Sequence, residues 1–181
     1  MTRFKDKYIK EAVPALTKEF TYTNPHQVPR ITKVVVSAGV GRAVSDGKHL
    51  DAAAETLAHV TGQKPVTTVA RKSIASFKLR EGNKVGATVT LRGARAEEFL
   101  DQLISVVLPR TRDFRGISAT AFDPHGNYSL GLSDHTIFPQ IAFEDAGAPH
   151  GLQVNVVTSA KTPAEGKRLL QLMGFPLKRT A

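Results

Sequence analysis

Residues 71–93 read RKSIASFKLREGNKVGATVTLRG, a basic loop that runs into a strand. The second half of this stretch alternates strictly, so apolar and polar side chains point to opposite faces of the strand. The apolar face carries Val89 and Leu91, and the polar face carries Thr88, Thr90 and Arg92. We therefore expect a strand at residues 87–92 with one buried face and one polar, positive face.

The positive charge around this stretch is almost unopposed. Between Lys64 and Arg95 there are eight Lys or Arg and one acidic residue, whereas the whole chain has 25 and 16. A merely solvated surface normally mixes its signs, so ordinary surface charge is the less favoured interpretation. A basic loop beside a positive strand face suits a phosphate backbone.

Composition narrows the function further. The 181 residues, 41% hydrophobic, suffice for one domain with a real core. A net charge of +9 implies a polyanionic partner, either nucleic acid or an acidic membrane surface. No apolar run approaches the ~18 residues of a membrane span, and the N-terminus lacks the apolar core of a signal peptide. The absence of Cys excludes disulfide and thiolate chemistry, and the absence of Trp argues against base stacking as the main binding device.

The rest of the chain predicts an α+β fold. Apolar periodicity and capping residues predict helices at residues 3–20, 46–61, 95–108 and 163–173. Alternating or apolar runs predict strands at residues 30–40, 64–70, 117–122, 127–132 and 152–157, with residues 137–141 extended. We expect a mostly antiparallel, ferredoxin-like or RRM-like sheet with helices on one face. Residues 1–181 form one domain in this interpretation, with residues 1–24 as an N-terminal helical segment packed on it.

Three local features sharpen these boundaries. Pro14 lies inside the first helical pattern and should kink or restart that helix. Asp123-Pro124-His125-Gly126 reads as the turn of a hairpin. Thr162-Pro163-Ala164-Glu165 combines a helix N-cap, a proline at the first helical position and the glutamate of a capping box.

Interpretations as an enzyme or a metal protein are weaker. The stretch from Gly41 to His49 resembles a phosphate-binding loop, but five residues separate its glycines and His49 replaces the magnesium-binding hydroxyl. Val44 occupies the third glycine position of a dinucleotide fingerprint. The six histidines lack the spacing of a zinc site. We expect no enzyme activity, no cofactor and no metal.

Six separated stretches, in order, resemble one family closely, that of the fifth protein of the large ribosomal subunit. They are residues 63–65, 70–74 with 77–80, 89–93, 109–116, 126–131 and 137–139. The resemblance covers essentially the whole chain and is of the bacterial type. It implies a cytoplasmic protein in the central protuberance of the ribosome, where the family binds 5S ribosomal RNA and attaches it to the large subunit.

Three sets of site residues follow from this resemblance, motif by motif. The 5S-binding face would comprise Ser37, Gln63, Thr88, Thr90 and Arg92. The loop reaching the elbow of the peptidyl-site transfer RNA would comprise Arg71, Lys72, Ser73, Phe77, Lys78, Arg80 and Lys84. A bridge to the thirteenth protein of the small subunit would use Arg110, Arg112, Arg115 and His150, near the loop around residues 145–150. Further partners implied are 23S RNA and neighbouring central-protuberance proteins, with no membrane contact and no self-association.

The chain departs from the family pattern at several of these places. Ser37 stands where the family usually has Asn, which puts one amide contact with RNA in doubt. His125 replaces a usual Arg in the hairpin turn, while Asp134-His135 and Gln140 replace Glu-Gln and Glu. The basic loop and the polar strand face are unaffected by these departures.

The residues also support RNA binding by their own chemistry. The loop cations Arg71, Lys72, Lys78, Arg80 and Lys84 would meet phosphates, and Arg92 offers a planar fork for a phosphate or a base edge. Thr88 and Thr90 could bond ribose hydroxyls, which distinguish RNA from DNA. Phe77 has two open interpretations, a base-stacking side chain or a plug that anchors the loop to the core. A peripheral protein of acidic membranes is the remaining alternative, and the helical pattern at residues 3–20 fits it weakly.

Overall fold

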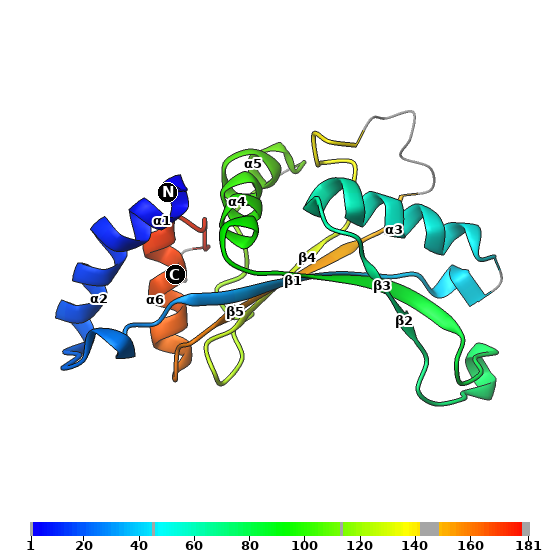
Figure 1. The fold of residues 1–181 in the computed structure, drawn as a ribbon, viewed down its shortest axis with the longest axis horizontal. Coiled ribbons are helices and arrows are strands. Elements are labelled where there is room, and N and C mark those ends of the chain that lie inside the picture. Colours follow the sequence, from blue (N-terminus) through cyan, green and yellow to red (C-terminus); the bar gives the residue numbers. More distant parts are fainter. Residues whose placement is uncertain (1, 45, 113, 142–148, 179–181) are drawn as a thin grey trace. The chain divides into compact units, whose positions relative to one another are not determined.

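A five-stranded sheet with strand order β2-β3-β1-β5-β4 forms the centre of the fold (Figure 1). The structure is a computed structural model and describes residues 2–44, 46–112, 114–141 and 149–178. The strands are β1 (Ile31–Gly39), β2 (Val66–Val69), β3 (Lys84–Leu91), β4 (Tyr128–Leu132) and β5 (Leu152–Thr158). The predicted class, an α+β fold with an antiparallel sheet and an N-terminal helix, is confirmed.

Six α-helices accompany the described strands. They are α1 (Arg3–Lys7), α2 (Val13–Phe20), α3 (Lys48–Thr61), α4 (Ala94–Gln102), α5 (Leu108–Arg110) and α6 (Pro163–Met173). Two π-helical turns, Tyr8–Ala12 and Leu103–Val107, join α1 to α2 and α4 to α5. The 3₁₀ turns are Pro25–Gln27, Gly41–Val44 and Ala75–Phe77.

The chain divides into two compact parts. The first part consists of Met1–Val34, Leu91–Leu130 and Asn155–Ala181, and the second of Val35–Thr90 and Gly131–Val154. The first part contains the N-terminal helices, α4, α5 and α6; the second contains α3 and the hairpin of β2 and β3.

In the second part, α3 lies along one side of β2 and β3 (Figure 1). Its buried side chains include Leu50, Ala53, Leu57 and Val60, the stripe expected from the sequence. The helix ends at Gly62, whose φ of 63° is left-handed and strain-free only for glycine. α3 begins at Lys48 with Gly47 as its N-cap and no side-chain capping bond, while the Asp46 carboxylate accepts a hydrogen bond from the Lys48 N–H at 3.0 Å just before the helix.

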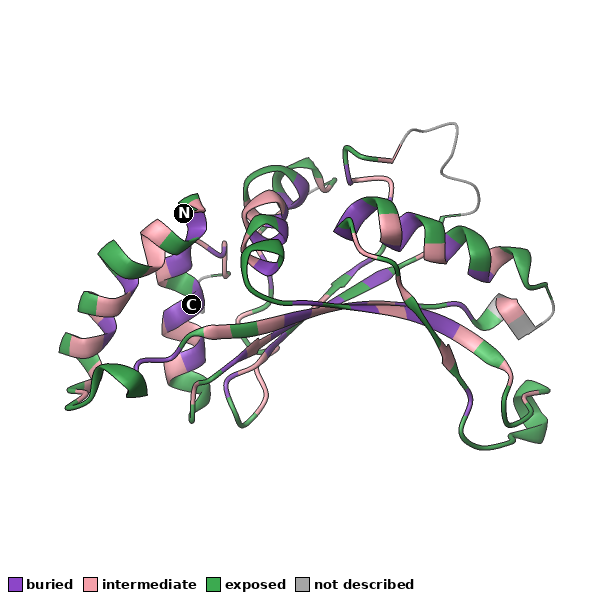
Figure 2. Cartoon of the chain, viewed as in Figure 1, coloured by how far each residue is buried: buried purple, intermediate pink, exposed green. Residues whose placement is uncertain are grey.

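In the first part, the N-terminal helices contact α6, and α1 also contacts α4. Phe4, Ala12 and Leu16 are buried, and Figure 2 shows buried stretches between exposed ones along the N-terminal helices. Pro14 lies at the start of α2, directly after the π-helical turn Tyr8–Ala12, and the backbone stays right-handed helical through Ala12 and Val13. The change expected in the helix at Pro14 takes the form of a π-helical turn before the proline, without a break in the helix.

The capped C-terminal helix also forms as expected. The Thr162 hydroxyl accepts from the Glu165 N–H, and the Glu165 carboxylate accepts from the Lys161 N–H at 2.8 Å. α6 ends at Gly174, with a φ of 95°. An ion pair between Arg168 and Glu19, with 2.6 Å between Nε and Oε2, ties this helix to α2.

Three predicted elements differ from the structure. The third helix continues past Pro109 to Arg110, because the π-helical turn Leu103–Val107 directly before this segment lets the helix accommodate the proline. Residues 137–141 form successive turns rather than an extended segment, since the Phe138 N–H donates to the His135 carbonyl and the Ile141 N–H to the Phe138 carbonyl. Burial of both Phe138 and His135 holds the chain in this folded-back path.

The expected strand at residues 117–122 is reduced to isolated pairings. Phe122 pairs with Tyr128 across the hairpin turn, but Ile117 pairs in parallel with Leu177 of the C-terminal tail. The Ile117 N–H donates to the Pro176 carbonyl at 2.9 Å, so the tail takes the hydrogen bonds that a hairpin partner would have used. Tyr128 is 1% exposed and its hydroxyl donates to the Ser118 carbonyl, while burial raises its pKa to about 12.

Candidate nucleic-acid interface

The polar face of β3 is open in the second part of the structure. Ala87 and Val89 are buried, whereas Thr88 is half-buried and Thr90 is exposed. β1 alternates in the same way, with Val36 and Ala38 buried and Ser37 between them half-buried. The backbone bond from the Val40 N–H to the Val85 carbonyl, at 2.9 Å, pairs the two strands so that Ser37 and Thr88 share the open face.

Gln63 joins this face from the end of α3. Its side-chain amide donates to the Thr90 carbonyl at 3.3 Å, so the amide nitrogen is positioned beside the strand. The Thr88 hydroxyl donates to the Val36 carbonyl at 3.3 Å, while the Thr90 hydroxyl is exposed and ready to bond a ligand. The structure thus brings together Ser37, Gln63, Thr88 and Thr90.

Gly86 lets β1 and β3 approach closely at the edge of this face. A Cβ at Gly86 would lie 2.5 Å from the Ala38 carbonyl oxygen and 3.1 Å from the Thr68 hydroxyl. Real Cβ atoms essentially never come that close to backbone oxygen, so any side chain here would push the strands apart.

The basic loop between β2 and β3 is a structured extension of their hairpin. Ile74 and Leu79 form an antiparallel bridge with backbone bonds of 2.9 and 3.1 Å in the two directions. At the base, the Ala70 N–H donates to the Asn83 carbonyl at 2.8 Å. The Glu81 N–H donates to the Ser73 hydroxyl at 2.9 Å, so this side chain connects the two strands of the loop.

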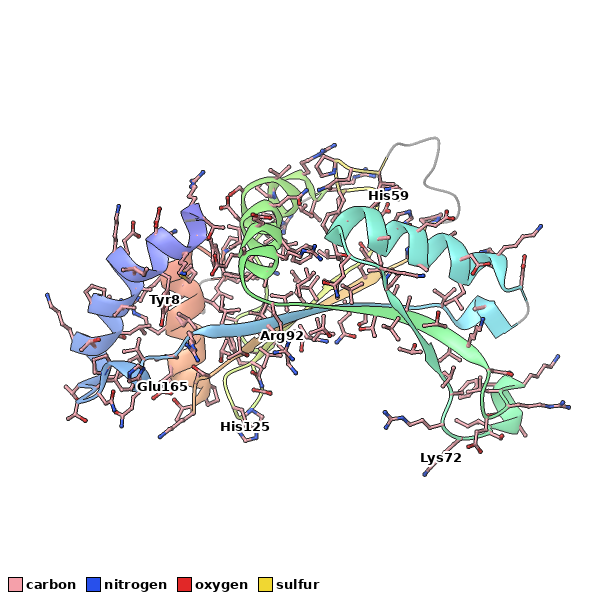
Figure 3. All side chains as sticks on the ribbon, viewed as in Figure 1. Tyr8, His59, Lys72, Arg92, His125 and Glu165 are labelled. Carbon is pink, nitrogen blue, oxygen red and sulfur yellow. The ribbon has the colours of Figure 1, made fainter. Side chains whose placement is uncertain are left out.

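Every residue from 71 to 78 is exposed, and Figure 3 shows Lys72 on the loop beyond the ends of β2 and β3. The exposed cations of the loop and its base are Arg71, Lys72, Lys78, Arg80 and Lys84. Phe77 is 73% exposed, so the interpretation of this ring as a plug against the core is wrong. An exposed aromatic ring among cations is a feature of single-stranded RNA sites.

The charge of the loop is not neutralised within the described part of the chain. The ion pairs found there join Asp134 to His135 and Glu19 to Arg168, both outside the loop. The loop's cations are therefore available to an external polyanion.

Arg92 follows β3 and belongs to the first part. It is exposed and lines a cavity of about 520 Å³, together with Lys5, Tyr8 and Arg30. The Arg30 guanidinium lies near the Tyr8 hydroxyl; burial raises the pKa of Tyr8 and the nearby positive charge moderates that rise. Sequence reasoning missed Lys5 and Arg30, since they lie far from Arg92 in the chain and carry no motif.

The residues expected at the subunit bridge lie in different environments. Arg110, Arg112 and Arg115 are exposed in the first part. His150, in the second part, stacks on the buried ring of His135 with centroids 3.9 Å apart, and its backbone N–H donates to His135 Nδ1 at 3.2 Å. Residues 145–148 of the expected bridge loop lie outside the described residues.

The remaining departures from the family pattern have local roles. The His125 N–H donates to Asp123, as do both the N–H and the side-chain amide of Asn127. Burial of Asp123 opposes its ionisation, but these hydrogen bonds outweigh burial and lower the pKa of the carboxyl. The turn is therefore held by Asp123, with the His125 side chain exposed.

Competing sites find little support in the described residues. Gly41–Val44 forms a 3₁₀ turn, and the helix after it begins at Lys48. No group of three or more His, Cys, Asp or Glu suited to a metal ion occurs in that part of the chain. Among the helices that the structure describes, none has the length and apolarity needed to cross a membrane.

The chain is similar to known ribosomal proteins. The family model described as "Ribosomal protein L5" matches residues 24–80, and the model for the C-terminus of the same ribosomal protein family matches residues 84–177. Proteins named large ribosomal subunit protein uL5 from Desulforapulum autotrophicum and Brevibacillus brevis are each 53% identical over 178 residues, covering 98% of this chain and 99% of the relative. The protein of that name from Streptococcus sanguinis is 51% identical over 177 residues, 98% of each chain.

Proposed function

The chain belongs to the ribosomal L5 protein family, and from this premise we propose that it binds 5S ribosomal RNA and attaches it to the large subunit. As a member of this family it is a non-enzymatic, structural constituent of the large ribosomal subunit, and so an rRNA-binding protein that works in the cytoplasm as part of the ribosome.

The observation that carries the proposal is the open polar face of β1 and β3. Ser37, Thr88 and Thr90 offer hydroxyls there, and Gln63 offers its amide. Hydroxyls and amides can bond ribose 2′-hydroxyls and base edges, which a purely cationic surface cannot read. Arg92 adds a guanidinium fork immediately after the same strand.

The basic loop has a separate role in this proposal. Its exposed cations and the exposed Phe77 ring contact the transfer RNA in the peptidyl site. The loop extends beyond the hairpin and is held by hydrogen bonds between its own residues. It can therefore bind a second RNA while the sheet face binds the first.

The exposed cations of the first part complete the proposal. Arg110, Arg112 and Arg115 meet the small subunit through the protein bridge that the resemblance implies, and His150 of the second part is a separate candidate for that bridge. The exposure and positive charge of these three arginines support the proposed bridge.

A hydroxyl deletion tests the sheet face. Thr90→Val keeps the β-branched shape and the Thr90 carbonyl that accepts a hydrogen bond from the Gln63 side-chain amide, but it removes the exposed hydroxyl. We expect 5S RNA affinity to fall by a free energy of about 0.5–1.5 kcal/mol, the net value of one hydrogen bond. Filter binding or fluorescence anisotropy of labelled 5S RNA measures the change.

Thr67→Val is the matched control, since Thr67 pairs with Ala87 and so points to the opposite face of the sheet. Equal losses in the two variants, or none in either, would remove the Thr90 hydroxyl from the interface. A DNA strand of the same sequence should bind the wild type and Thr90→Val alike, because DNA lacks the ribose hydroxyl.

A further inference from the structure

The cavity beside Arg92 is a formed site in the first part of the structure. Its volume of about 520 Å³ falls within the ~300–1,000 Å³ typical of sites for small ligands. Its walls come from the N-terminal helical segment, the start of β1, the first turns of α4 and the end of α6. Only Arg92 among its residues belongs to the RNA face described above.

The inner wall of this cavity is apolar. Phe4, Ala96, Leu100 and Met173 line it, and each is at most 5% exposed in the folded chain. In front of these buried residues, the half-buried side chains of Tyr8 and Ile31 also line the cavity and present the apolar surface against which a flat group can lie.

The mouth of the cavity is cationic. Lys5, Arg30 and Arg92 are all exposed there, and two of them carry the guanidinium fork that matches phosphate oxygens. Glu97 is the one acidic residue of the lining, and its carboxylate accepts a hydrogen bond from the Thr2 hydroxyl. That carboxylate repels a phosphate from the interior but can accept the N–H groups of a nucleobase edge.

The backbone that carries Arg30 at the mouth is held in place by hydrogen bonds. The Arg30 N–H donates to the Ser159 hydroxyl at 3.0 Å, and the Ser159 N–H returns a bond to the Arg30 carbonyl at 2.9 Å. The Tyr8 hydroxyl donates to the Pro29 carbonyl at 3.1 Å, and the Thr32 hydroxyl to the Val157 carbonyl at 3.0 Å. These bonds fix the backbone on both sides of Arg30, so little order is lost when a ligand binds.

We infer that this cavity binds one nucleotide unit, with its base against the apolar wall and its phosphate at the cationic mouth. Only a ligand with both a flat apolar part and an anionic part uses both regions of the site. The unit comes either from an unpaired residue of RNA or from a free nucleoside monophosphate. In the first case the inference rests on the proposed function, because the RNA is then the one that the sheet face holds.

Titration of the full-length chain with nucleoside 5′-monophosphates and with inorganic phosphate tests the site itself. Calorimetry or equilibrium dialysis should show at least one monophosphate binding about tenfold or more tightly than phosphate, the contribution expected of a stacked base. Equal affinities would mean attraction by surface cations alone and would overturn the inference.

Two variants connect that binding to the cavity. Ala96→Leu fills the apolar wall and Arg30→Gln removes one charge from the mouth, so each should weaken monophosphate binding by about fivefold or more. Arg95→Gln is the matched control, because Arg95 is exposed on the same helix but does not line the cavity. A loss in the control equal to that in Arg30→Gln would overturn the inference, and so would no loss in both cavity variants. Thermal unfolding of each variant shows whether Ala96→Leu remains folded. If Ala96→Leu does not fold, the comparison of Arg30→Gln with Arg95→Gln tests the inference.

Chemical modification of bases in bound 5S RNA identifies the source. If the nucleotide comes from RNA, one unpaired base is protected by the wild type and becomes reactive with Ala96→Leu, while the rest of the footprint persists. Monophosphate binding with no such base assigns the site to free nucleotides. A chain that fails to select 5S RNA yet binds monophosphates would contradict the proposed function and leave the cavity site supported.

Discussion

Gly86 is the residue on which the open face of the sheet most depends. It lies between Val85 and Ala87 on β3, where β1 and β2 both run alongside. The missing Cβ lets the Ala38 carbonyl and the Thr68 hydroxyl approach the strand from either side. Loss of that space would displace the strands that carry Ser37 and Thr88.

We predict that Gly86→Ala destabilises the protein by about 1–3 kcal/mol, the usual cost of overpacking against atoms that cannot move aside. Chemical denaturation measures the free energy of unfolding. Gly39→Ala is the control on the neighbouring strand, since a Cβ there has no atom within 4 Å and the backbone is not left-handed. Similar costs for the two substitutions would show that the close contact at Gly86 is not the cause.

Arg92 is the residue for which a single substitution should change RNA affinity most. Its guanidinium is exposed at the end of β3 and can make two parallel bonds to a phosphate or a base edge. We predict that Arg92→Ala weakens 5S RNA binding by about 1–3 kcal/mol. Anisotropy titrations on the folded variant measure this, with Arg95→Ala as a control for loss of one nearby charge. Unchanged affinity would exclude Arg92 from the interface.

The β2–β3 hairpin is the element whose function the sequence predicted most directly. The run of cations and the two flanking glycines identified an exposed basic loop, and the structure confirms the exposure of every residue from 71 to 78. The internal bridge between Ile74 and Leu79 was not predicted, because a single pairing inside a loop has no periodicity. β3 also begins at Lys84, three residues before the alternating pattern of residues 87–92 starts.

Removal of three loop charges should separate the two proposed RNA contacts. We predict that replacing Arg71, Lys72 and Lys78 with Ala weakens binding of transfer RNA by about tenfold while 5S affinity changes little, since the loop is not part of the sheet face. The salt dependence of transfer-RNA binding should also become shallower, in proportion to the number of phosphates that these three cations neutralise. Equal reductions in affinity for both RNAs would mean that the loop is not a separate site.

Elements fixed by local chemistry were predicted better than those fixed by distant partners. The capping residues around Thr162 and the glycines at 62 and 174 set helix ends through bonds within a few residues. Residues 117–122 alternate like a strand, yet the C-terminal tail takes the Ile117 backbone bonds. Pairing with a segment so distant in the sequence cannot be predicted from the local pattern. The burial of Phe138, which accompanies the turns at residues 137–141, cannot be predicted from it either.

At the scale of the whole molecule, the same limit applies to the candidate site. The hydroxyls of β3 were predictable because strand alternation assigns each residue to a face, whereas Ser37 on β1 was expected only from the resemblance. The cavity was not, because Lys5, Arg30 and Arg92 come from three distant segments that only the fold assembles. We also propose that residues 1–181 behave as one domain, since β1 and β5 each contribute residues to both compact parts.

The most direct test of RNA recognition is a comparison of 5S RNA with an unrelated RNA of equal length across a salt series. Attraction between the +9 chain and phosphates weakens steeply with salt for any RNA, whereas contacts with ribose and base edges remain. We predict that 5S binding persists at salt concentrations that release the competitor. Parallel dissociation of both RNAs as salt rises would contradict the proposal that this chain has a shaped site for 5S RNA.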